Sequence, residues 1–205
     1  TFVVCCVCIF SDTKVFPVGK ETLKSIARLF QAEQKTWQKP KVSIQISTVS
    51  KSALPAEDLI PKIAPSVVSI RTDKSLGSGF IISTDGLIMT NRHVVTGSGV
   101  GKFQISTSSN QKTSASVVYI DKQLDFAILK PDSRLQAAPL PICYLSYPKA
   151  GQDVIAIGSP DGIAGTVTKG VVSAVRQPVD QLRGLAPEGV LLVQHDAAIS
   201  PGNSG

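Results

Sequence analysis

From Ser66 onward, the chain alternates short β-rich runs with turns that contain glycine or several polar residues. Short strands that recur with such turn signals are typical of an all-β sandwich or barrel. Nine runs qualify as strands, six before a proline-rich stretch and three after it: Ser66–Thr72, Gly77–Ser83, Leu87–Asn91, Lys102–Thr107, Thr113–Asp121, Asp125–Lys130, Asp153–Gly158, Thr166–Arg176 and Val190–Gln194. The proline-rich stretch, Pro131–Gly151, separates the two groups. The pattern therefore predicts an all-β domain built in two parts.

The residues before this domain follow other patterns. Lys20–Gln38 carries apolar residues at the spacing of an amphipathic helix, namely Leu23, Ile26, Ala27 and Phe30. After Pro40, apolar residues alternate with polar ones from Val42 to Ile46, which predicts a short strand. Ser50–Asp58 has the composition of a linker. We therefore expect an N-terminal region at 1–56 and one domain at 57–205, with its two parts at about 64–135 and 150–205.

The first ten residues, Thr1–Phe10, form an apolar stub that contains Cys5, Cys6 and Cys8. A stub of this length cannot span a bilayer, which needs about 20 apolar residues in a helix. Since the first residue is also not methionine, we interpret the stub as the tail of a longer signal peptide or membrane anchor. We do not expect a metal site there, because no second cysteine or histidine pair lies nearby at a ligand spacing.

The charge pattern argues against nucleic-acid binding, and the cysteine count excludes a disulfide within the predicted β domain. The net charge of +6 comes from 21 basic and 15 acidic residues, and the basic residues are scattered along the chain. Nucleic-acid binding usually needs a clustered basic patch, so we do not expect it. Cys143 is alone in the predicted β domain, so no disulfide can close within that domain.

The chain ends in Pro201-Gly202-Asn203-Ser204-Gly205, a tight turn that carries a serine. A serine nucleophile needs a base, an acid that orients the base, and donors for the oxyanion. His93 follows an apolar run, as expected for a base on a loop, and Asp125 opens another apolar run. The order His, Asp, Ser, with separations of 32 residues (93 to 125) and 79 residues (125 to 204), favours the chymotrypsin-like arrangement over subtilisins and α/β-hydrolases.

Four motifs in this order resemble the HtrA/Deg family of trypsin-like serine proteases. They are Gly77-Ser78-Gly79-Phe80-Ile81-Ile82, Thr90-Asn91-Arg92-His93-Val94-Val95, Asp125-Phe126-Ala127-Ile128-Leu129-Lys130 and Asp196-Ala197-Ala198-Ile199-Ser200-Pro201-Gly202-Asn203-Ser204-Gly205. The resemblance runs from about residue 57 to the end. It implies a chymotrypsin-like double β-barrel with a complete first barrel. Arg92, His195 and Ser200 depart from the residues most common in that family.

The resemblance also implies roles for single residues. His93 is the general base, Asp125 fixes its tautomer, and Ser204 is the nucleophile. The backbone amides of Gly202 and Ser204 form the oxyanion hole. Asn203 is neutral where trypsin-like zymogens carry an activating aspartate, so we do not expect activation by propeptide cleavage.

Three other positions near the proposed site have less specific interpretations. Gln177–Gly189 matches the position of the family's sensor loop, although an ordinary connector fits equally well. His195 and Asp196 are read as structural rather than catalytic.

The function implied is a serine endopeptidase that cleaves unfolded or misfolded proteins through an acyl-enzyme, without a metal or organic cofactor. A homotrimer-based assembly and a bacterial cell-envelope location, periplasmic, membrane-anchored or secreted, are implied as well. An organelle of bacterial descent is the alternative location. Two other functions stay open: a secreted glutamyl-endopeptidase-like protease of the same fold, and a non-catalytic chaperone or peptide-binding module.

The strand count leads to one more expectation. If the second barrel also needs six strands, the three candidates before Gly205 supply half of it. The second barrel is then truncated, and we expect an exposed sheet edge with unpaired backbone groups.

Overall fold

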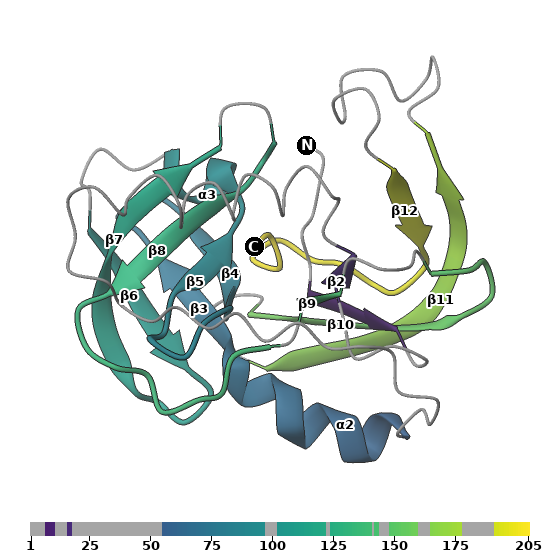
Figure 1. The fold of residues 1–205 in the computed structure, drawn as a ribbon, viewed down its shortest axis with the longest axis horizontal. Helices are drawn as coiled ribbons and strands as arrows, with labels where there is room; N and C mark the ends of the chain where they lie inside the picture. The colour runs from purple at the N-terminus through teal and green to yellow at the C-terminus, as the bar shows by residue number, and fades with distance from the viewer. Residues whose placement is uncertain are drawn as a thin grey trace.

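The computed structural model describes residues 55–96, 102–121, 124–140, 148–159, 165–177 and 191–205 in full, and the backbone of 7–10, 16–17 and 142–143. The helix predicted at 20–38 and the strand predicted at 42–46 lie outside the described residues. Figure 1 shows a barrel and a second sheet side by side, with a helix below both and the C-terminal end between them.

The first six strands of the predicted domain close into a barrel with the order β3-β4-β5-β8-β7-β6. Neighbouring strands pair antiparallel throughout. Their bounds are β3 Val67–Arg71, β4 Leu76–Ile81, β5 Ile88–Thr90, β6 Lys102–Thr107, β7 Lys112–Ile120 and β8 Ala127–Pro131. The prediction of an all-β class is confirmed, with strand ends shifted by up to two residues.

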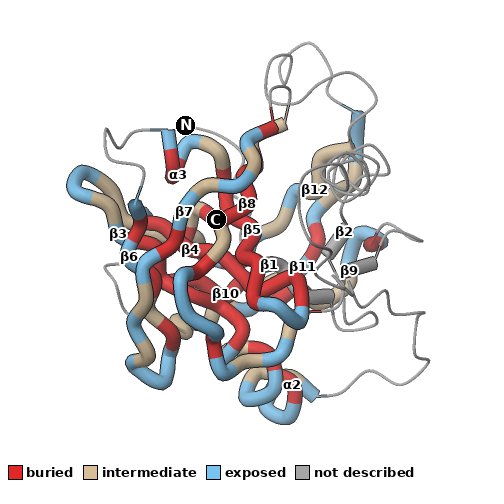
Figure 2. Tube along the Cα trace, turned by 60° about the vertical axis from the view of Figure 1, so that its left-hand side comes forward, coloured by how far each residue is buried: buried red, intermediate tan, exposed pale blue. Residues whose placement is uncertain are grey.

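Alternating side chains of these strands build two separate cores. Residues such as Val68, Ile70 and Leu129 fill the interior of the barrel. Their sequence neighbours Val67 and Ile128 point the other way, into a second core. Figure 2 shows that buried residues continue from the barrel into the second sheet. The strands β3, β4, β5 and β8 are buried on both faces, so nearly all of their residues are buried, including the glycines and serine of β4.

An α-helix occupies part of the segment that the sequence predicts to be a linker. Helix α2 spans Ala56–Ile63, so residues 56–58 of the predicted linker are helical. Leu59 and Ile63 lie four residues apart on one face and are buried in the second core, together with Ile155 and Ile157. The composition suggested a linker, but this apolar pair packs the short helix against the core that the barrel and the sheet share.

The second sheet has the order β1-β10-β11-β12 and does not close on itself. Strand β10 spans Asp153–Gly158 and β11 spans Thr166–Arg176, both as predicted, while β12 spans Leu192–His195. Strand β1, Val7–Phe10, pairs antiparallel with the other edge of β10, with Cys8 opposite Ala156. The edge of β10 is therefore paired, and the pairing partner comes from the apolar stub.

A short strand pair lies in the stretch that joins the two parts of the domain. Strand β9, Ile142–Cys143, pairs parallel with β2, Phe16–Pro17. The stretch Pro131–Gly151 was not among the nine predicted strands. None of the helices in the described ranges has the length and apolarity that a membrane crossing requires.

Candidate active site

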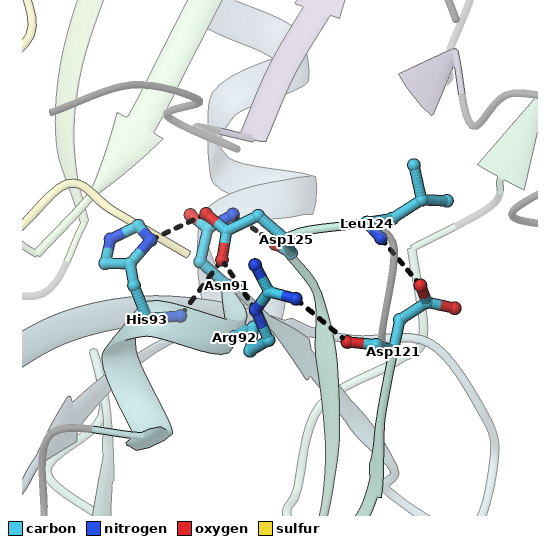
Figure 3. Close-up of polar contacts among 6 residues, drawn as sticks. All are labelled: Asn91, Arg92, His93, Asp121, Leu124 and Asp125. Carbon is cyan, nitrogen blue, oxygen red and sulfur yellow. Dashed lines mark hydrogen bonds and ion pairs between the residues drawn. The ribbon is translucent and has the colours of Figure 1, made fainter. Parts of the chain in front are cut away.

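His93 lies on the one-turn helix α3, Arg92–Thr96, directly after β5. Val94 and Val95 are buried in the barrel core and anchor this helix. The side chain of His93 is 50% exposed and points toward the side of the barrel where the C-terminal segment lies (Figure 3). The apolar pair that follows His93 thus holds the backbone, while the imidazole remains accessible.

Asp125 contacts His93 through both carboxylate oxygens (Figure 3). Its Oδ2 lies 2.6 Å from Nδ1 of His93, and its Oδ1 accepts the backbone N–H of His93 at 3.0 Å. The carboxylate side chain is 18% exposed. An ionised carboxylate can only accept hydrogen bonds, so Nδ1 carries the proton and Nε2 is left as the acceptor. This is the tautomer that a general base needs.

Two residues beside His93 steady the segment that carries Asp125. Asn91 Nδ2 donates to the backbone carbonyl of Asp125 at 2.8 Å. Arg92 Nε lies 4.0 Å from Asp125 Oδ1, and Arg92 Nη1 donates to the carbonyl of Asp121 at 3.3 Å. These contacts join the two loops from both sides (Figure 3).

Asp121 is a supporting residue that the sequence analysis did not identify. It is buried, accepts the Leu124 backbone N–H on Oδ1 at 2.6 Å, and accepts the Tyr119 hydroxyl on Oδ2 at 2.9 Å. Its backbone N–H donates to the carbonyl of Phe126 at 3.0 Å. Asp121 thereby closes the turn that presents Asp125. The available signal was an aspartate at the end of a predicted strand, where its side chain commonly accepts a backbone N–H of the following turn.

The C-terminal segment docks on β4. Ser78 N donates to the carbonyl of Ser204 at 2.6 Å, and Ser78 Oγ donates to the carbonyl of Gly202 at 2.7 Å. Gly202 has φ +94°, in the left-handed region that favours glycine. The Gly77-Ser78-Gly79 motif, which contributes to the family resemblance, is therefore also a contact surface. Its contact with the segment Gly202–Ser204 was not predicted.

Ser204 lies next to the histidine helix. A Cβ added to Gly77 would come within 2.7 Å of Val94 Cγ1 and within 3.0 Å of the Ser204 carbonyl. Gly77 is therefore the narrow spacer between α3 and the serine. Within the described residues, the hydroxyl of Ser204 makes no hydrogen bond with the ring of His93. The structure brings His93 and Asp125 into contact and places Ser204 nearby. Catalytic hydrogen bonds often tighten only when substrate binds.

Asn203 is buried, in contrast to its neighbours Gly202 and Ser204. Its side chain packs so closely on Gly158, at the end of β10, that a Cβ at Gly158 would collide with it. Its backbone N–H donates to the carbonyl of Ser200 at 3.1 Å. The side chain at position 203 therefore anchors the turn on the second sheet.

His195 and Asp196 lie at the base of the same segment. Asp196 Oδ1 accepts the backbone N–H of Val171 at 2.6 Å, next to the irregular pairing of β11 with β12. Burial lowers the pKa of His195 below its usual 6.5, although Asp196 and a hydrogen bond with the Ala197 backbone both act to raise it. Neither residue contacts His93 or Asp125 in the interactions described. The predicted sensor loop lies outside the described residues, apart from Gln177.

The trypsin-like peptidase domain family matches residues 77–205. The serine protease PepD of Mycobacterium tuberculosis is 38% identical over 162 residues, which cover 73% of this chain and 35% of PepD. A probable periplasmic serine endoprotease, DegP-like, of Halomonas elongata is 42% identical over 137 residues, which cover 64% of this chain and 26% of that protein. The chain thus spans about a third or less of the length of these relatives.

Two solved structures have similar folds. An HtrA-type protease, AlgW, solved with a tripeptide, superposes with a TM-score of 0.58 and 36% sequence identity, covering 71% of this chain and 47% of that one. A serine endoprotease from Yersinia pestis superposes with a TM-score of 0.57 and 31% identity, covering 71% of this chain and 50% of that one. The resemblance inferred from the four motifs is confirmed.

Proposed function

Because the chain belongs to the HtrA family of trypsin-like serine proteases, we propose that it is a serine endopeptidase that uses Ser204, His93 and Asp125. The observation that carries the proposal is the double contact between His93 and Asp125. One carboxylate oxygen lies 2.6 Å from Nδ1, and the other accepts the backbone N–H of the same residue at 3.0 Å. This contact sets both the tautomer and the orientation of the imidazole.

The proposed reaction has two acyl-transfer steps. Ser204 Oγ forms a bond to the carbonyl carbon of the scissile peptide, and its proton passes to Nε2 of His93. The carbonyl oxygen becomes an oxyanion, which the backbone N–H groups of Gly202 and Ser204 stabilise. When the C–N bond breaks, the leaving amine takes the proton from His93. Water then repeats the sequence on the acyl-enzyme and releases the acid.

Fluorophosphonate labelling tests this assignment. A fluorophosphonate phosphorylates an activated serine, so we expect one label per molecule, located on Ser204 by peptide mass spectrometry. Ser204→Ala should abolish labelling, whereas Ser200→Ala, which alters an exposed serine four residues away, should leave it unchanged. Absence of label in the wild-type protein, or label that persists in Ser204→Ala, contradicts the proposal and favours a non-catalytic peptide-binding role.

For the substrate we propose unfolded or misfolded polypeptide. Support comes from the family and from two relatives named serine proteases or endoproteases. A folded protein and its reduced, alkylated form supply a matched pair of substrates. We expect cleavage of the unfolded form alone, and equal cleavage of both forms contradicts this specificity.

We also propose a trimer-based assembly in the bacterial cell envelope, with a membrane anchor at the N-terminus. The DegP-like relative is named as periplasmic, which supports the location. Light scattering coupled to size-exclusion chromatography measures the assembly, and a monomer mass contradicts it. Cell fractionation measures the location, and recovery in the cytosol contradicts it.

A further inference from the structure

We infer that Ser78 is a positioning residue whose hydroxyl sets the orientation of the oxyanion turn at Gly202–Ser204. This inference rests on the proposed function, since it concerns the same site. Ser78 lies in the middle of β4 and is 1% exposed. It belongs to the barrel that carries His93 and Asp125, whereas the turn that it holds follows the second sheet.

All polar groups of Ser78 are used in long-range contacts. Its Oγ donates to the carbonyl of Gly202 at 2.7 Å and accepts the backbone N–H of Ser159 at 2.8 Å. Its N–H donates to the carbonyl of Ser204 at 2.6 Å, and its carbonyl accepts the hydroxyl of Thr90 at 2.7 Å. A hydroxyl can donate one hydrogen bond and accept another at once, as these two contacts of Oγ require.

These contacts fix the peptide planes on both sides of the serine amide. The carbonyl of Gly202 belongs to the plane between residues 202 and 203, and the carbonyl of Ser204 to the plane between 204 and 205. The N–H of Ser204 lies in the plane between these two. Since a peptide unit is planar, holding both neighbouring carbonyls leaves the Ser204 N–H little freedom to rotate away. Gly202, at φ +94°, otherwise has an unusually permissive backbone.

The glycines around Ser78 allow this close approach. A Cβ on Gly205 would collide with the backbone carbonyl of Ser78, and Gly205 itself has φ +152°. Gly77 leaves room for the Ser204 carbonyl in the same way. The turn therefore lies directly on the β4 backbone, where the hydroxyl of Ser78 can reach it.

The same hydroxyl links the turn to the second sheet. Ser159 follows β10 and is fully buried, and the preceding Gly158 packs against Asn203. Removal of the hydroxyl leaves the partly buried Gly202 without this donor to its carbonyl and the buried N–H of Ser159 without this acceptor. Each group then has a lower free energy if it turns toward another hydrogen-bond partner. The turn has to reorient, although no atom that reacts with substrate has been removed.

Ser78→Ala tests the inference, with Ser66→Ala as its matched control. Ser66 is also 1% exposed, and its hydroxyl donates to the carbonyl of Ala138 at 2.6 Å, at the start of β3 and away from the turn. We expect Ser78→Ala to lower the fluorophosphonate acylation rate constant and kcat by about tenfold, with KM nearly unchanged. Ser66→Ala should leave all three unchanged.

Hydrogen–deuterium exchange supplies a readout that does not depend on activity. Ser78→Ala should speed exchange in a peptide ending at Gly205, whereas Ser66→Ala should not. If Ser78→Ala also loses protection across the barrel strands, Ser78→Cys replaces it, since a thiol keeps the volume and a weak donor. We then expect Ser78→Cys to acylate more slowly, and to exchange faster in this peptide, than the wild type.

Wild-type acylation and exchange rates in a folded Ser78 variant would overturn the inference. Equal effects of Ser78→Ala and Ser66→Ala would overturn it as well, because the hydroxyl would then be merely structural. Failure of the wild-type protein to react refutes the proposed function instead. In that case the exchange comparison still decides whether Ser78 holds the turn.

Discussion

His93 and Asp125 share two hydrogen bonds, one from the imidazole Nδ1 to Oδ2 at 2.6 Å and one from the backbone N–H to Oδ1 at 3.0 Å. The carboxylate therefore holds the ring and the helix turn that carries it. The second bond makes ring orientation depend on the backbone of α3, which Val94 and Val95 anchor in the barrel core.

Replacement of Asp125 by asparagine keeps the shape but removes the charge. An amide can present its NH₂ group to Nδ1, which favours the wrong tautomer of His93. We expect kcat/KM for a peptide substrate to fall by about 10³- to 10⁴-fold. Asp132→Asn, at an exposed position outside these contacts, is the control and should retain wild-type kcat/KM. Retained activity in Asp125→Asn contradicts the role assigned to Asp125.

Gly158→Ala tests the packing of the turn Gly202–Ser204 on the second sheet. The added Cβ collides with the Asn203 side chain, so we expect the turn to shift and unfolding to become easier by about 1–3 kcal/mol. Acylation by a fluorophosphonate should slow in parallel. Gly151 is the control, since it has φ +87° but open space around an added Cβ. Gly151→Ala should lower the free energy of unfolding by about 1 kcal/mol without slowing acylation. Acylation of Gly158→Ala at the wild-type rate would contradict this packing.

His195 should make stability depend on pH. Burial lowers its pKa in the fold below the unfolded value of 6.5, so the unfolded chain takes up the proton more readily. The stabilisation is fully present above pH 6.5 and is lost as the pH falls through the folded-state pKa. Between about pH 7.5 and 5, we expect the free energy of unfolding to fall further in the wild type than in His195→Gln. Parallel curves for the two proteins would exclude this contribution.

The pairing of β1 with β10 predicts a specific cross-link. Cys8 lies opposite Ala156, and directly paired antiparallel residues have Cβ atoms about 4.5–5.5 Å apart. With Cys5, Cys6 and Cys143 changed to serine, Ala156→Cys should form a disulfide with Cys8 on mild oxidation. Thr168→Cys is the control, because Thr168 pairs with Ala156 from β11, on the side of β10 away from β1. Mass spectrometry of unreduced peptides detects the bond, and cross-linking in the control alone contradicts the register.

Helix α2 should contribute measurably to stability through Leu59. This side chain is buried with Ile155 and Ile157 in the core between barrel and sheet. We expect Leu59→Ala to lower the free energy of unfolding by about 2–4 kcal/mol, from lost burial and the remaining cavity. Lys62→Ala, on the exposed face of the same helix, should stay within about 1 kcal/mol. Denaturant titration measures both, and equal effects would show that α2 does not pack as described.

Much of the first barrel was predictable because strand patterns are local. Each strand from β3 to β8 carries its own apolar run or alternation, bounded by glycine or polar turns, so neighbouring residues suffice to identify it. His93 and Asp125 were also identified from their flanking segments, and the structure brings them into contact. Their catalytic roles, that of Ser204 and the domain boundaries stay predictions.

Helix α2 and Asp121 show where local patterns fail. Residues 56–58 look like a linker, and only the core formed by β10 and the barrel gives Leu59 and Ile63 a surface to pack on. Asp121 looks like an ordinary polar strand end until its turn is seen to carry Asp125. For α2 the packing partners lie in other elements, so the local sequence holds no record of them. For Asp121 the partners Tyr119 and Leu124 are close in the sequence, but only the folded turn shows that the contacts support Asp125.

By itself, the sequence determined the β class, the approximate bounds of the barrel strands along the chain and the residue types available for acyl transfer, because periodicity and composition act over a few neighbouring residues. The tertiary structure alone decided that the Val7–Phe10 segment pairs with β10 and that Ser78 holds Gly202, 124 residues away. Backbone hydrogen bonds between such distant segments depend on where the barrel and the second sheet bring them, and every chain segment carries the same backbone donors and acceptors.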